Sequence, residues 1–147
     1  MAGVLTVYDQ NILARKSAIV SQRKPYSDLD VTLSLNDRGD ISPLEDIEAV
    51  KQSVKNLILT VFGERPFQPR LGSGLKGLLF EPADRITIAV LRKAIYDVLI
   101  RNESRVDSLV VQVTDDSDNN RYQVTLGFRV VSLSQEVDIT VYLQRIR

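Results

Sequence analysis

Three segments of alternating apolar and polar residues fill the last third of this 147-residue chain, and they limit its fold more than any other feature. Residues 109–113, 122–130 and 137–143 place apolar side chains at every second position. Such alternation is typical of a strand with one buried face. The runs between them, residues 115–120 and 132–136, are polar and turn-like. The sequence therefore predicts an antiparallel three-stranded meander whose apolar face needs a cover.

Two amphipathic helices are predicted upstream and can supply that cover. In the first, Ser42 is placed to cap the helix, Pro43 to fill its first position and Glu45 to complete a capping box. We expect this helix to run from Pro43 to Val61 and the second from about Asp84 to Asn102. Helices before a meander predict an α+β fold with two helices packed on a small antiparallel sheet.

The N-terminal part of the chain has a different character. Leu29, Val31, Leu33 and Leu35 alternate with polar residues and predict one more half-buried strand, added to the sheet of the meander. Residues 1–28 are predicted to be an arm that is partly ordered or bound to a partner. Residues 29–147 are predicted to form a single α+β domain.

The composition excludes several classes of function. Lys plus Arg and Asp plus Glu both number 19, and this zero net charge argues against nucleic-acid binding and a polybasic membrane anchor. The chain has no Cys and no His, which excludes disulfide frameworks, Cys/His zinc sites and Ser-His-Asp triads. No cofactor is predicted. No signal peptide or apolar run of about 18 residues is seen, so we expect a soluble protein of the reducing cytosol.

The predicted helices are joined by an apolar connector that is rich in Gly and Pro, residues 63–82. Four of its side chains are predicted to anchor it by burial: Phe67, Leu71, Leu75 and Phe80. Residues 72–77 match G-x-G-x-x-G, but a dinucleotide site needs a strand before this motif and a long helix after it. A helix precedes it here, so the glycines are interpreted as bends in the backbone.

Carboxylates are the acid–base groups left for catalysis. Four of them lie near predicted helix ends: Glu64, Glu81, Asp84 and Glu103. A glycosidase would need two carboxyl groups about 5 Å or about 6.5–9.5 Å apart. In the structural alternative Asp84 caps the second helix, and the first two glutamates pair with nearby arginines, namely Arg65, Arg70 or Arg85.

The junction between the second helix and the meander is a further candidate site. Glu103 and Arg105 flank Ser104 there. Both charges can lie in a solvated turn, which the residues alone favour. They can also form a recognition element, in which Arg105 grips a carboxylate or backbone carbonyl groups of a partner.

Taken together, these motifs resemble a known family. The order is a helix, G-E-R-P-F-x-P-x-x-G-S-G-L from Gly63, L-F-E-P from Leu79, a D-x-x-T helix start at Asp84, and E-x-R at Glu103. It is similar to the phage T4-type baseplate wedge and sheath-initiator family of contractile tails, with relatives in type VI secretion and tailocins. The resemblance covers about residues 42–143. The family usually has Pro at the position of Ser104.

The resemblance implies a structural role in a virion, assembled in the host cytoplasm. It implies docking of Glu103 and Arg105 on a helical bundle of other wedge proteins, and tail sheath strands added to a sheet edge. Tube or hub proteins are further implied partners, with six copies per particle. Two alternatives stay open: a lysozyme-like peptidoglycan hydrolase that uses two of the four carboxylates, and a cytosolic adaptor of the same fold.

Overall fold

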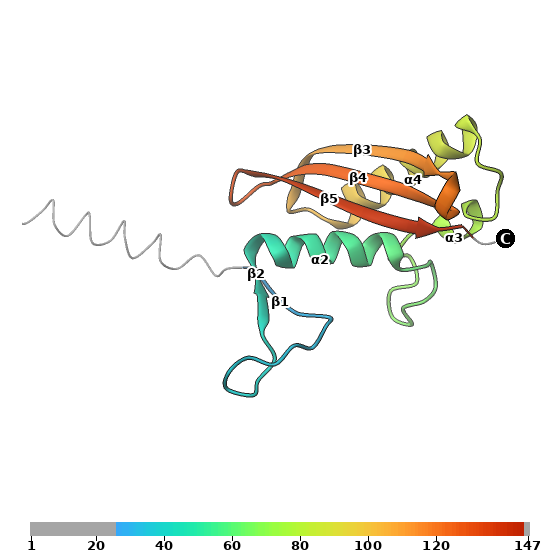
Figure 1. Cartoon of the computed structure of the whole chain (residues 1–147). Helices are drawn as coiled ribbons and strands as arrows, with labels where there is room; N and C mark the ends of the chain where they lie inside the picture. The colour runs from blue at the N-terminus through green and yellow to red at the C-terminus, as the bar shows by residue number, and fades with distance from the viewer. Residues whose placement is uncertain (1–25, 146–147) are drawn as a thin grey trace, which may run out of the picture.

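The structure of this chain, a computed structural model, describes residues 26–145 (Figure 1). Most of the predicted arm, residues 1–28, thus lies outside the described residues. The elements in chain order are β1 (Ser27–Leu29), β2 (Pro43–Glu45), α2 (Asp46–Leu59), α3 (Leu75–Leu78), α4 (Arg85–Asn102), β3 (Val106–Asp116), η1 (Ser117–Asn119), β4 (Arg121–Val130) and β5 (Gln135–Gln144). Within the described range, no helix is long and apolar enough to span a membrane.

The C-terminal meander is present as an antiparallel sheet with the order β3-β4-β5. Its central strand is paired on both sides: Val124, for example, lies opposite Val113 of β3 and Val141 of β5. Alternate β4 residues from Tyr122 to Val130 are buried. Helices α2 and α4 lie on the same side of the sheet (Figure 1) and cover this apolar face. The predicted α+β class is therefore confirmed.

The two helices meet the sheet in one hydrophobic core. The largest fully buried side chains of the helices are Val50, Val54, Ile58, Leu91, Ile95 and Leu99. Helix α4 begins close to its predicted start, because the Asp84 carboxylate accepts a hydrogen bond from the Thr87 N–H group at 2.6 Å. It ends at Asn102, as predicted.

The predicted start of the first helix is wrong. Pro43–Glu45 forms β2, which pairs antiparallel with β1, and α2 begins only at Asp46. The Asp46 N–H group donates to the Tyr26 carbonyl at 2.6 Å, and Ser42 donates its own N–H to the Ser34 carbonyl. These long-range partners accept hydrogen bonds from backbone N–H groups near the start of α2, which side chains of a capping box would otherwise accept.

The predicted strand over residues 29–35 is also wrong. Only Leu29 lies in a strand, and β1 and β2 form a separate two-stranded sheet. Asp30 bends the chain, because its carboxylate accepts hydrogen bonds from Thr32 and Ser34 and its carbonyl accepts one from the Leu33 N–H. The four alternating apolar side chains are 59–67% exposed. The proposed boundary after residue 28 cuts through β1.

The connector after α2 folds back on the end of that helix. Val61 and Ser73 form a parallel bridge, and the Ser73 hydroxyl donates to the Ile58 carbonyl at 2.7 Å. Leu75 is buried in the core and Leu71 packs against it. The expectation that two aromatic side chains also anchor the connector is wrong, because Phe67 is 98% exposed and Phe80 is 58% exposed.

Gly72 shows why this connector needs glycine. Its φ is +117°, and a Cβ there would lie 2.6 Å from the Thr60 carbonyl oxygen. The G-x-G-x-x-G match is preceded by α2, and the only helix that starts on it is the four-residue α3, so it lacks the frame of a dinucleotide site. Its glycines shape the backbone.

We predict that Gly72→Ala lowers the free energy of unfolding by about 2–3 kcal/mol, because it adds a strained φ and a clash with Thr60. The matched control is Gly77→Ala, since a Cβ at Gly77 meets no atom within 4 Å. Urea unfolding followed by circular dichroism measures both variants. Equal stability of the two variants would contradict this account of Gly72.

Candidate docking site at the junction of α4 and β3

The candidate site is the turn that joins the end of α4 to the start of β3. Glu103 caps α4, and its N–H group donates to the Leu99 carbonyl at 2.9 Å. The Arg105 carbonyl accepts a hydrogen bond from the Val131 N–H group at 3.0 Å, just after β4. The turn is thus held by the helix on one side and the sheet on the other.

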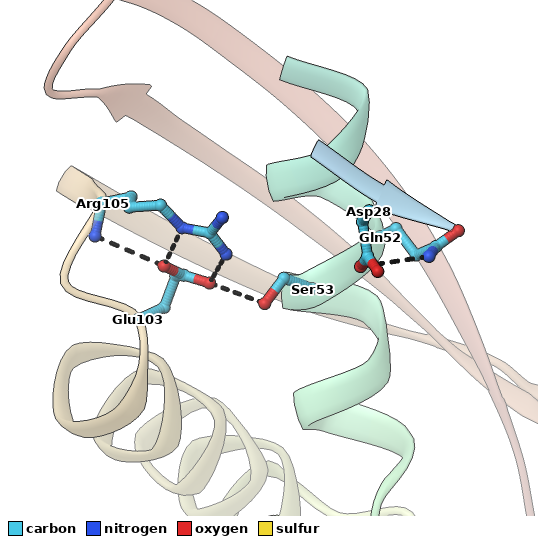
Figure 2. Close-up of polar contacts among 5 residues, drawn as sticks. All are labelled: Asp28, Gln52, Ser53, Glu103 and Arg105. Atoms are coloured by element: carbon cyan, nitrogen blue, oxygen red, sulfur yellow. Dashed lines mark hydrogen bonds and ion pairs between the residues drawn. The ribbon is translucent and has the colours of Figure 1, made fainter. Parts of the chain in front are cut away.

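The Glu103 carboxylate is the centre of this site (Figure 2). Its Oε1 accepts from Arg105 Nε at 2.7 Å, and its Oε2 accepts from Arg105 Nη2 at 2.6 Å. Oε2 also accepts from the Ser53 hydroxyl of α2 at 2.7 Å. The Glu103 side chain is only 5% exposed. One buried carboxylate therefore joins α2, the end of α4 and the start of β3.

The surroundings of Glu103 keep it ionised. Burial on its own would raise its pKa, but the hydrogen bonds from Arg105 and Ser53 and the charge of Arg105 outweigh burial. The pKa of Glu103 therefore lies below the ordinary value of a glutamate. The hydrogen bonds to Glu103 likewise raise the pKa of Arg105. This is a two-pronged ion pair of the kind that arginine forms with carboxylates.

Arg105 also reaches the N-terminal hairpin of β1 and β2. Its guanidinium lies over the Tyr26 ring at 5.1 Å from the centroid, and its side chain is 27% exposed. Gln52 of α2 donates to the Asp28 carboxylate at 3.2 Å and to the Leu29 carbonyl, so the hairpin is fastened to α2 beside the junction. Figure 2 shows the Gln52–Asp28 contact beside the Ser53–Glu103 contact, and the two α2 residues that make them are adjacent in sequence.

These contacts correct one interpretation of the sequence and add residues to the site. Glu103 is buried, so the solvated-turn interpretation is wrong for it, and it does not project its charge outward. The structure brings it together with Arg105, as the spacing of two residues allows. Ser53, Gln52 and Tyr26 were not predicted, because a polar residue within a helix carries no sequence signal for a partner about 50 positions away.

The four candidate carboxylates do not form one acid–base site. Asp84 and Glu103 cap opposite ends of α4, whose 18 residues span about 27 Å. Asp84 serves as the helix cap, as its structural alternative predicted. Glu64 accepts a hydrogen bond from the Val61 N–H at 2.8 Å in place of the predicted arginine. Among the described residues, no group of acidic side chains could hold a metal ion.

The ion pair predicts a pH dependence of stability. Because the folded pKa of Glu103 lies below its ordinary value of 4.5, the pair stabilises the fold fully above pH 4.5 and this contribution is lost as pH falls through the folded pKa. We expect Glu103→Gln to lower the free energy of unfolding by about 1–3 kcal/mol at pH 7. The difference from wild type should shrink toward pH 3. Denaturant titrations at pH 3–7 measure it, with exposed Glu136→Gln as control, and a constant difference would contradict the assignment.

The sequence comparisons identify the family of this fold. Residues 44–135 match the family described as baseplate wedge protein gp25. The baseplate wedge protein gp25 of Enterobacteria phage T4 is 29% identical over 115 residues, which cover 78% of this chain and 87% of the phage protein. These matches confirm the resemblance that the motifs indicated.

Solved structures show the same fold at lower identity. A candidate tail lysozyme from Geobacter sulfurreducens aligns with a TM-score of 0.64 at 21% identity, over 68% of this chain and 91% of that protein. A chain of the anti-feeding prophage baseplate aligns with a TM-score of 0.54 at 18% identity, over 84% of this chain and 88% of its own. Since the family match spans more than half of its residues, this chain belongs to the baseplate wedge protein gp25 family.

Proposed function

We propose that this chain is a structural baseplate wedge subunit and sheath initiator of a contractile tail or related injection machine. It would act by contact in the tail baseplate and not by catalysis. The observation that carries the docking part is the ion pair of the buried Glu103 with Arg105 at the junction of α4 and β3. Membership of the family makes the chain a baseplate component. Docking and sheath initiation are the steps that we add.

Arg105 is the residue of the pair that can reach a partner. Glu103 uses the Nε and Nη2 groups of Arg105, while the side chain as a whole stays 27% exposed. Arginine has five N–H donors, so its remaining donors can bind carboxylates or the carbonyl groups at helix ends. Glu103 would hold the guanidinium in one orientation, which reduces the conformational entropy lost on docking. The partner proposed here is a helical bundle of other wedge subunits.

The meander offers a surface for sheath initiation. Within residues 26–145, β3 and β5 each pair on one side only, with β4. An unpaired strand edge can accept an extended segment through main-chain hydrogen bonds. Strands from tail sheath subunits are the proposed occupants. Six copies per particle are proposed with them, and the six-fold symmetrised baseplate that contains the anti-feeding prophage chain supports this number.

The docking proposal predicts the effect of a single substitution. Arg105→Ala should abolish binding to purified wedge subunits in a pull-down and in analytical ultracentrifugation, because it removes the oriented donors. It also leaves Glu103 buried without its partner, so we expect stability to fall by about 2–3 kcal/mol. Binding is therefore measured at a temperature at which circular dichroism shows the variant to be folded.

Two controls separate docking from stability and from charge. Ser53→Ala removes one hydrogen bond to Glu103 but leaves the exposed side of Arg105 intact, so it should bind wedge subunits. Arg129→Ala removes an exposed, ion-paired arginine from β4 and should also bind. Normal assembly of Arg105→Ala, or equal loss in all three variants, would exclude the docking role.

A peptidoglycan hydrolase is the second candidate, and the fold shared with the candidate tail lysozyme is the observation that favours it. Glu103 cannot serve as the general acid, because Arg105 and Ser53 keep it charged. Of the four predicted carboxylates, Glu64, Glu81 and Asp84 are left.

We predict that the purified chain releases no soluble fragments from peptidoglycan at pH 5–7. Fragment release would be followed by chromatography, with an authentic lysozyme as the positive standard. Release that is lost in Glu64→Gln or Glu81→Gln would overturn the structural proposal and establish the hydrolase.

A further inference from the structure

The two free edges of the meander differ in regularity. Strand β3 has a register shift between Asp107 and Val110, and Ser108 lies there with a φ of +52°. A bulge of this kind twists an edge away and discourages further pairing. Strand β5 keeps one register with β4 from Gln135 to Gln144 and has no bulge. Strand β5 is therefore the better template for an added strand.

The helices leave different space beside the two edges. Helix α4 packs closely against β3, whereas α2 makes few contacts with β5. Figure 1 shows β5 as the strand of the sheet that runs along α2. Between α4 and β3 the groove follows residues 111–114 of the strand. A separate hollow that spans all three strands reaches Ser108, Val110 and Gln112. Next to β5 two adjoining grooves share Glu48 and Lys51 and together follow residues 135–141.

The groove beside β5 has the dimensions of one short strand. Residues 135–141 span about 20 Å as a strand, and the 14 residues of α2 span about 21 Å. An extended segment of about six residues has the same length. Apolar side chains from β2, α2, β5 and the loop after β1 line the part of the groove that includes Leu59, namely Val31, Leu44, Leu59, Ile139 and Val141.

The two ends of this groove differ in charge. Five carboxylates line the end at the start of α2: Glu45, Asp46, Glu48, Glu136 and Asp138. Lys51 is the one basic residue of that end, and it pairs with Glu48 at 2.7 Å. Further along α2 the charges of the lining balance, because Lys51 and Lys55 face Asp30 and Glu48 there, beside polar and apolar side chains. The chain as a whole has zero net charge, so this acidic end is a local concentration that favours a basic occupant.

We infer that β5 is the edge that accepts a partner strand, and that this strand carries lysine or arginine at the end that lies beside Glu136 and Asp138. The inference rests on the proposed strand addition. It specifies which edge of the sheet is used and which charge the added strand carries. The strand would pair with residues 135–141, place alternate apolar side chains toward α2, and neutralise the carboxylates with its basic end.

Synthetic peptides test this inference on the full-length chain. All three peptides alternate valine and threonine over six residues. One carries two lysines at its N-terminal end, one carries them at its C-terminal end, and the third carries two glutamates in place of the lysines. NMR measures hydrogen exchange of each backbone amide. We expect a lysine peptide to slow exchange at alternate positions in residues 135–141, and the glutamate peptide to bind at least about tenfold more weakly.

Charge-reversal variants provide the matched control. Glu136→Lys combined with Asp138→Lys should raise the Kd of the lysine peptide at least about tenfold. Asp37→Lys combined with Asp118→Lys makes the same change in net charge outside the groove and should leave the Kd within about twofold. The inference is overturned if neither lysine peptide binds, if amides of residues 111–114 are protected instead, or if both double variants behave alike.

The same measurement with purified tail sheath protein separates this inference from the proposed function. Protection of residues 111–114 by the sheath protein would leave strand addition standing and exclude β5. No protection at either edge would exclude strand addition itself.

Discussion

The apolar face of a three-stranded meander is the constraint on which this structure depends. Only β4 is paired on both sides, so the sheet cannot stand alone and needs a cover over side chains such as Tyr122 and Leu126. Helices α2 and α4 supply the cover on one face. With both helices on that face, the edges of β3 and β5 stay open within the described residues, as the proposed strand addition requires.

Polar contacts at the junction of α4 and β3 also hold the helices to the sheet. The sheet and the helices meet where α4 ends, and the buried Glu103 carboxylate satisfies groups from both layers. Burying a carboxylate is costly unless its oxygens are paired, and here Arg105 binds both oxygens while Ser53 also binds Oε2. The group that stabilises the turn therefore also orients Arg105, the residue that we propose for docking.

Local patterns predicted the elements whose partners are near in sequence. The meander and α4 follow from periodicity of two and of about 3.6, and the Asp84 cap lies three residues from the N–H group that it binds.

Patterns failed where distant contacts decide the structure. Ser42 and Pro43 satisfy every local rule for a helix start, but pairing of β2 with β1 overrides them. Alternation over residues 29–35 also predicted a strand, yet the turn at Asp30 leaves those side chains exposed. The motif order indicated the family, whereas the burial of Glu103 and its hydrogen bond from Ser53 became visible only in the fold.

Strand β2 ends at Glu45 and α2 begins at Asp46, with no linker between them. The N-terminal hairpin is also fastened to α2 by Gln52 and to the junction by stacking of Tyr26 on Arg105. The hairpin and α2 are therefore one continuous unit, which also touches Arg105 at the junction. A force applied to the hairpin would be transmitted through α2 to the hydrophobic core, in which Val50, Val54 and Ile58 are fully buried.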